Sequence, residues 1–186
     1  QYEIFEFLGI DTKRIKKTHD FVNSLSDRMG HFAPYPGGGG CYDYDAIFLL
    51  TFLGNRSSLK YDSLLKKTLK SILSEQNDDG GLSESLYIRP RSFKNLKSMT
   101  QHLIEKKGRI RVERARFCLT LLRFKHNKIK THWTKYSRDW HESNLWDSWF
   151  RMLTIARIDN SISLSSSNWG FINFPGIGYS HILSNN

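Results

Sequence analysis

The 186-residue sequence predicts an all-α domain, and three observations carry that prediction. No stretch alternates apolar and polar side chains over a convincing length, as a half-buried strand would. Apolar residues recur instead at helical spacing through most of the chain. The segments also alternate in character, because Lys-rich amphipathic stretches precede Gly-rich loops and more apolar stretches follow them. This order is expected of helical hairpins in which an outer helix covers an inner one.

The first segments read as two helices. Residues 1–10 have the apolar density of the last turns of a buried helix that stops at Gly9. Asp11 and Thr12 can cap an amphipathic helix that runs to about Asp27, with apolar side chains on one face and lysines on the other.

A glycine-rich loop then leads into an apolar helix. The loop, residues 30–42, holds two prolines and four consecutive glycines. Residues 43–46 open a helix whose apolar part, residues 47–53, stops at Gly54. Since its apolar residues go all round, we expect this helix to be buried.

Four further helices are predicted in the rest of the chain. Ser57 or Ser58 can cap an amphipathic helix that ends near Glu75 in a Gly-Gly turn. The segments that follow are a loop and then a helix within 83–108, a helix over 110–124, a polar Trp-bearing stretch over 126–144, and an apolar helix over 145–158.

Composition describes one folded, basic domain over residues 1–186. With 39% hydrophobic and 13% aromatic residues, the chain has too much apolar surface to be a disordered tail. The longest apolar stretch, residues 46–53, is far shorter than the roughly 20 residues that cross a bilayer. The formal charge of +10 suggests an anionic partner, but the basic residues are spread over helix faces and no nucleic-acid-binding motif accompanies them.

The cysteines indicate the cellular compartment of the protein, and the first residue indicates whether the domain is truncated. Cys41 and Cys118 have neither disulfide-framework nor zinc-site spacing, so a reducing cytoplasm is the expected compartment. The chain begins with Gln1 and not with a secretion signal. We therefore expect the domain to be truncated at its N-terminus, with the C-terminus open to the same interpretation.

The chain also contains an internal repeat. Residues 32–39 match residues 171–178 without a gap, sharing the pattern F-x-x-aromatic-P-G-x-G. Gly30 and Gly170 extend the match, and Gly80 takes the same place after its own predicted outer helix. Such spacing is typical of a repeat made of two helices.

These residues resemble a known family. Residues 73–82, LSEQNDDGGL, are similar to the QxxDGG element of terpene cyclases and protein prenyltransferase β subunits, and residues 37–54 resemble the step from loop to inner helix in the same repeats. The resemblance implies an α/α toroid, of which this chain would supply about three or four hairpins. It also implies a central cavity for an isoprenoid or similar apolar ligand, with the N-terminal ends of the inner helices around its mouth.

The resemblance selects the candidate site residues. It places Asp43 and Asp45 as an acidic pair, with Asp147 opposite, and makes these three the candidate catalytic residues. The candidate substrate-binding residues are aromatic: Tyr42, Tyr44, Trp146 and Trp149. Basic side chains could bind a diphosphate. The alternative for the acids is that they complement the positive end of a helix dipole, and the alternative for the aromatic residues is core packing.

No cofactor or metal is expected from the family motifs. The sequence Asp43-Tyr44-Asp45-Ala46 lacks the last acid of the DxDD motif of class II terpene cyclases. The order Cys41-Tyr42-Asp43 reverses the Asp-x-Cys pair of zinc-dependent prenyltransferases. A later zinc-ligating His would also be needed, and His132, His141 and His181 lie in no ligand motif.

Two other functions remain open at the level of sequence. A carbohydrate-active toroid would use Asp43 or Asp45 with Asp147 across a glycosidic bond and stack sugar rings on the aromatic residues. A non-catalytic scaffold would bind a protein or an anionic surface. Isoprenoid binding is the leading hypothesis, and whether the domain is an enzyme is left open.

Overall fold

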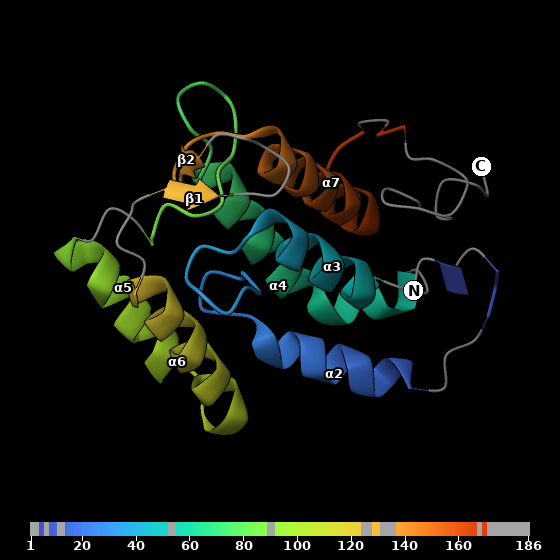
Figure 1. Cartoon of the computed structure of the whole chain (residues 1–186). Helices are drawn as coiled ribbons and strands as arrows, with labels where there is room; N and C mark the ends of the chain where they lie inside the picture. Colours follow the sequence, from blue (N-terminus) through green and yellow to red (C-terminus); the bar gives the residue numbers. More distant parts are fainter. Residues whose placement is uncertain are drawn as a thin grey trace.

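The computed structural model confirms an all-α fold (Figure 1). It describes residues 4–5, 8–10, 14–51, 55–88, 92–123, 128–130, 137–166 and 169–170. The helices are α2 (Ile15–Leu25), α3 (Gly40–Thr51), α4 (Asn55–Ser74), α5 (Phe93–Ile104), α6 (Gly108–Arg123) and α7 (Leu145–Ile162). Two three-residue strands, β1 (Lys128–Lys130) and β2 (Ser137–Asp139), pair antiparallel.

Helix α3 is the centre of the larger group of helices. It packs against α2, α4 and α7, as Figure 1 shows. Apolar residues on most sides of α3 are buried, as the sequence predicts for this segment. The core around it gathers residues from α2, α3, α4, α7 and the loop before α3: Val22, Phe32, Ala46, Ile47, Leu50, Tyr61, Leu65 and Ile158.

Helices α3 and α7 run parallel. At their first turns, Gly40 lies so close to α7 that a Cβ there would be 3.0 Å from the Asp147 carbonyl oxygen. Near their other ends, Arg157 Nε donates to Thr51 Oγ1 at 2.7 Å. The N-terminal ends of both helices therefore lie at the same end of the bundle.

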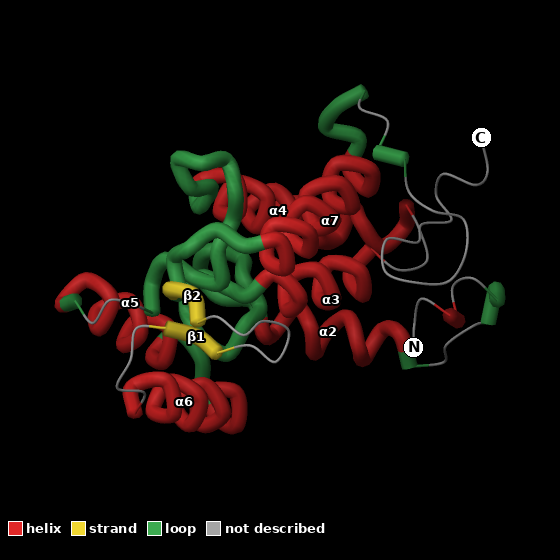
Figure 2. The backbone as a smooth tube through the Cα atoms, turned by 45° about the horizontal axis from the view of Figure 1, so that its top comes forward, coloured by secondary structure: helices red, strands yellow, loops and turns green. Residues whose placement is uncertain are grey.

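Helices α5 and α6 form a separate hairpin beside the small β-ribbon (Figure 2). Helix α5 begins after Ser92, whose hydroxyl accepts from the Asn95 N–H at 3.1 Å. A second core joins this hairpin to the loops: Ala33, Tyr35, Ile88, Met99, Leu121 and Trp140.

The structure corrects the sequence prediction in local details. Helix α3 already begins at Gly40, three residues before Asp43, and the polar segment 126–144 contains the two strands. Strands of three residues are too short to show an alternating pattern. The predicted caps Asp11 and Thr12 and the second repeat copy, residues 171–178, lie outside the described residues.

The toroid stays a prediction. Parallel inner helices are what it requires, and α3 and α7 have that arrangement. In the described part of the chain, no helix combines the length and apolar character needed to span a bilayer.

Candidate functional site

The site predicted from sequence lies where α3 and α7 begin. Asp43 is in the first turn of α3 and Asp147 in the first turn of α7. Since the two helices are parallel and in contact, the structure brings these two turns to one end of the bundle. The side chains of this region nevertheless divide into a buried set and an exposed set.

Asp147 is buried and takes part in the cap of α7. Asn144 Oδ1 accepts from the Asp147 N–H at 2.9 Å, and Asn144 Nδ2 donates to Asp147 Oδ2 at 2.6 Å. The pair therefore satisfies backbone and side-chain groups at a helix N-terminus, where the dipole also favours a negative charge.

Asp43 is fully buried, and both of its oxygens have partners. His31 Nδ1 lies 2.7 Å from Asp43 Oδ2, and the Phe32 N–H donates to Oδ1 at 2.9 Å. The other ring nitrogen of His31 lies 3.0 Å from Glu75 Oε1, and Arg151 donates to Glu75 Oε2 at 3.0 Å. We call His31, Asp43, Glu75 and Arg151 the buried ion network.

Charge pairing decides the protonation of His31. Burial lowers its pKa, but Asp43 and Glu75 outweigh that effect and raise the pKa from 6.5 to about 10. The imidazolium therefore persists at neutral pH, with a carboxylate at each ring nitrogen. Such a network holds α3, α4 and α7 together and gives Asp43 a structural partner on each oxygen.

The glycine run of the loop fits over this network. Arg151 donates to the Gly37 carbonyl oxygen at 2.8 Å. Gly38 has φ +68°, and a Cβ there would lie 2.6 Å from Asp43 Oδ2 and 2.8 Å from His31 Nδ1. Only glycine allows both this backbone conformation and this approach. The loop therefore closes over the buried ion pair.

The less buried side chains of this region are Tyr42, Asp45, Glu84, Trp146 and Trp149, which we call the acid-aromatic set. The three aromatic side chains are 41–42% exposed. Asp45 is exposed and Glu84 is half-buried, accepting a hydrogen bond from the Tyr35 hydroxyl. Asp43 and Asp45 therefore lie on different sides of α3, because residues two positions apart in a helix are separated by about 200°.

The pKa of Cys41 is sensitive to the negative charges of this region. Burial raises its pKa, and the charges of Glu84, Asp45 and Asp147 raise it further, to about 11. Tyr44, in contrast, is buried against Phe48 and Phe150. It therefore has the core position that sequence analysis gave as the alternative to substrate binding.

A pocket of about 470 Å³ lies between α2, α6 and the loop before α3. Its walls are mainly apolar, with Tyr42 and three charged residues among them. The lining residues are Phe21, Leu25, Phe32, Ala33, Pro34, Tyr42, Arg109, Ile110, Glu113 and Arg114. The pocket is distinct from the central cavity implied by the family resemblance, which stays a prediction.

The three charged residues of the pocket differ in how far they are neutralised. Arg114 is buried and donates to the carbonyl oxygens of His102 and Leu25 at 2.7 Å each. Glu113 pairs with Arg116 at 3.1 Å. Arg109 is exposed, and no carboxylate of the described residues forms an ion pair with it. Arg109 is therefore the cation with most freedom to meet an anionic ligand.

Sequence reasoning missed several residues of this region. His31, Glu75 and Arg151 had no motif of their own, although Glu75 lies within the QxxDGG-like element. Of the three histidines considered as ligands, His141 is exposed, and His132 and His181 lie outside the described residues. Comparison with known proteins gives no match, either to family models or to curated proteins or solved structures.

Proposed function

We propose that the protein binds a small amphipathic anion, an isoprenoid or similar apolar chain that carries a phosphate or diphosphate, in the pocket between α2 and α6. The apolar lining of this pocket, with Arg109 exposed at it, is the observation that supports the proposal. Its volume of about 470 Å³ lies within the roughly 300–1,000 Å³ typical of small-molecule sites.

The two parts of such a ligand would meet different walls. The chain would cover Phe21, which is 60% exposed, and contact Leu25 and Ile110. The head group would meet the guanidinium of Arg109, whose planar fork suits phosphate oxygens. The ten surplus positive charges of the chain favour the approach of an anion.

The proposal is one of binding, with no catalytic acid assigned to the pocket. A proton donor must reach its substrate. Asp43 and Asp147 are instead buried and hydrogen-bonded at the helix ends.

Calorimetric titration of the folded chain with farnesyl diphosphate tests this proposal. We expect saturable binding that weakens at least tenfold with geranyl diphosphate, because each buried CH2 group contributes about 0.8 kcal/mol. Arg109→Gln should weaken binding about tenfold, which corresponds to about 1.4 kcal/mol. Ile110→Trp should fill the pocket and abolish binding, whereas Val112→Trp, exposed on the same helix, should not.

The charge control is Arg123→Gln. Arg123 is exposed in the last turn of α6, about 21 Å along the helix from Arg109, and its replacement removes the same charge. Equal losses in the Arg109 and Arg123 variants would mean general electrostatic attraction and would contradict a defined site. A flat titration on folded protein would reject the pocket ligand altogether.

A glycan is the second candidate ligand, and the acid-aromatic set near the N-terminal ends of α3 and α7 is the observation that favours it. Trp146, Trp149 and Tyr42 are partly exposed, and such rings stack on sugars while carboxylates accept hydrogen bonds from them. We expect oligosaccharides to quench Trp fluorescence, with loss of the effect in Trp146→Ala and no change in Arg109→Gln. Turnover of a polysaccharide that requires Asp45 would make this set catalytic. If neither ligand class binds, the scaffold function is favoured.

A further inference from the structure

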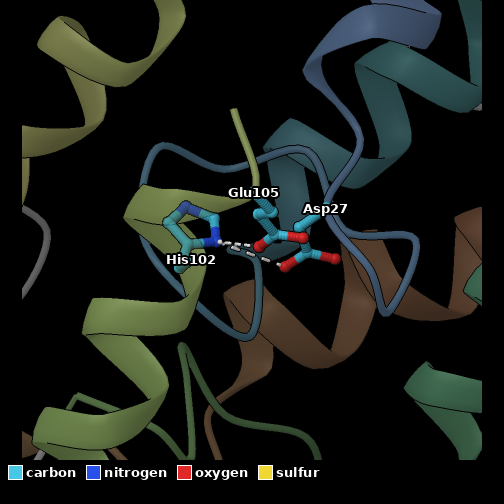
Figure 3. Close-up of side chains that lie close together, drawn as sticks. All are labelled: Asp27, His102 and Glu105. Atoms are coloured by element: carbon cyan, nitrogen blue, oxygen red, sulfur yellow. Dashed lines mark ion pairs between the residues drawn. The ribbon is translucent and has the colours of Figure 1, made fainter. Parts of the chain in front are cut away.

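Three side chains from distant parts of the chain converge beside α5. Asp27 lies in the turn after α2, His102 in the last turn of α5, and Glu105 directly after that helix (Figure 3). His102 Nδ1 lies 3.5 Å from Asp27 Oδ2 and 3.6 Å from Glu105 Oε1. One ligand atom from each residue falls within 4.8 Å of the other two.

Backbone hydrogen bonds orient both carboxylates toward His102. Asp27 Oδ1 accepts from the N–H groups of Met29 and His31, at 2.8 and 3.0 Å. Glu105 Oε2 accepts from the Arg28 N–H at 2.7 Å. Each carboxylate thus has one oxygen held by the backbone and the other turned toward the imidazole, and carboxylates that ligate metals are held by hydrogen bonds in the same way.

His102 is buried without a satisfied ring nitrogen. Its exposure is 2%, and neither Nδ1 nor Nε2 has a hydrogen-bond partner among the described residues. The distances of 3.5 and 3.6 Å to the carboxylates are too long for good hydrogen bonds. A buried polar atom without a partner costs about 1–3 kcal/mol, and both ring nitrogens of His102 are such atoms in the described part of the chain.

We propose that Asp27, His102 and Glu105 bind a divalent transition-metal ion of the Zn²⁺ class. Ligands at about 2.0–2.2 Å from a tetrahedral zinc ion are separated from one another by about 3.3–3.6 Å. The separations of 3.5 and 3.6 Å from His102 Nδ1 to the two carboxylate oxygens agree with that spacing. Zinc binds through imidazole and carboxylate groups, and a water on the partly exposed side of Glu105 would complete four ligands.

The charges around the cluster favour one ion. The two carboxylates balance a divalent cation. Arg114 lies 3.5 Å from Glu105 Oε1, held by the His102 and Leu25 carbonyl oxygens, and half-buried Lys106 is a second nearby cation. These cations limit the site to a single metal ion.

The ion would join the α5–α6 hairpin to the turn after α2. Asp27 and His102 are 75 residues apart in the sequence, and Arg114 of α6 contacts the same group. The role is therefore structural, and metal should raise the melting temperature. In the sequence only His102 and Glu105 are close together, three residues apart, so local spacing does not predict the cluster.

The test uses the full 186-residue chain after treatment with a chelator. We expect calorimetry with Zn²⁺ to give one ion per chain with a Kd of micromolar or below, Co²⁺ to give a visible d–d spectrum, and Zn²⁺ to raise the melting temperature. Glu105→Gln and His102→Gln should weaken Zn²⁺ binding at least tenfold and remove the Co²⁺ band. Mg²⁺ should not compete.

Two controls separate this site from surface binding. Glu113→Gln on α6 and His141→Gln, both at exposed side chains, should leave the binding unchanged. The proposal is overturned by the absence of Zn²⁺ binding, by stoichiometry that persists in both cluster variants, or by a Co²⁺ spectrum that depends on His141. If His102→Gln fails to fold, Glu105→Gln decides the question, because that carboxylate is partly exposed.

Discussion

Asp43→Asn removes one charge from the buried ion network while keeping the shape of the side chain. Asp45→Asn, two residues along the same helix, is the matched control, since Asp45 is exposed. The pKa of His31 rises from 6.5 to about 10, which corresponds to roughly 5 kcal/mol in favour of the imidazolium. Asp43 is one of two carboxylates that produce this effect, and Glu75 remains in the variant.

We expect Asp43→Asn to lower the free energy of unfolding by about 3 kcal/mol, at the lower end of the 3–5 kcal/mol for breaking a buried ion pair. Asp45→Asn should change it by less than about 0.5 kcal/mol. Urea titration at pH 7, followed by circular dichroism at 222 nm, measures both. With m about 1–3 kcal/mol/M, the Asp43 variant should unfold at a midpoint at least about 1 M lower.

A loss below about 1 kcal/mol in Asp43→Asn, or equal losses in the two variants, would refute the structural role of Asp43. Affinity for farnesyl diphosphate gives a second reading. The folded Asp43→Asn protein should bind as wild type does, because Asp43 does not line the pocket. A large loss of affinity for farnesyl diphosphate without a loss of stability would instead show that Asp43 takes part in ligand binding.

Three further predictions rest on the same region. The pKa of His31 is higher in the folded than in the unfolded protein, so the stabilisation by the His31 imidazolium is complete below about pH 6.5 and is lost as the pH rises to about 10. Urea titrations should show the free energy of unfolding falling over this range, and the fall should be smaller in His31→Gln. Burial raises the pKa of Cys41 to about 11. At pH 7.5 the native thiol should therefore react with iodoacetamide about 100-fold more slowly than the thiol of the urea-unfolded protein. Mass spectrometry of the Cys41 peptide measures both rates, and equal rates would contradict this. Gly38→Ala should lower the free energy of unfolding in urea by about 3 kcal/mol, because the new Cβ adds a close contact with Asp43 to the strain of the left-handed backbone. Gly80→Ala, where φ is +82° and no atom lies within 4 Å of the new Cβ, should lower it by only about 1–2 kcal/mol. Equal losses would show that the close contact does not matter.

Local pattern determined the helices of this protein. Side chains within one helix repeat every 3.6 residues, so periodicity revealed α4 and α7 from the chain alone. It also predicted that α3, apolar on all sides, would be buried, and it placed Asp43 and Asp147 in first turns. Periodicity did not predict strands β1 and β2, because three residues are too few to show a period.

Only the tertiary structure decided which polar groups meet. Glu75 reaches His31 across 44 residues and Arg151 across 76, and Asp27 reaches His102 across 75. These contacts depend on how helices pack, and packing distances and rotations are not encoded in local spacing. For the same reason sequence assigned Asp43 to a cavity mouth, whereas packing surrounded it with His31 and the glycine loop. The sequence thus specified the helices, and packing decided whether each acid faces a partner or the solvent.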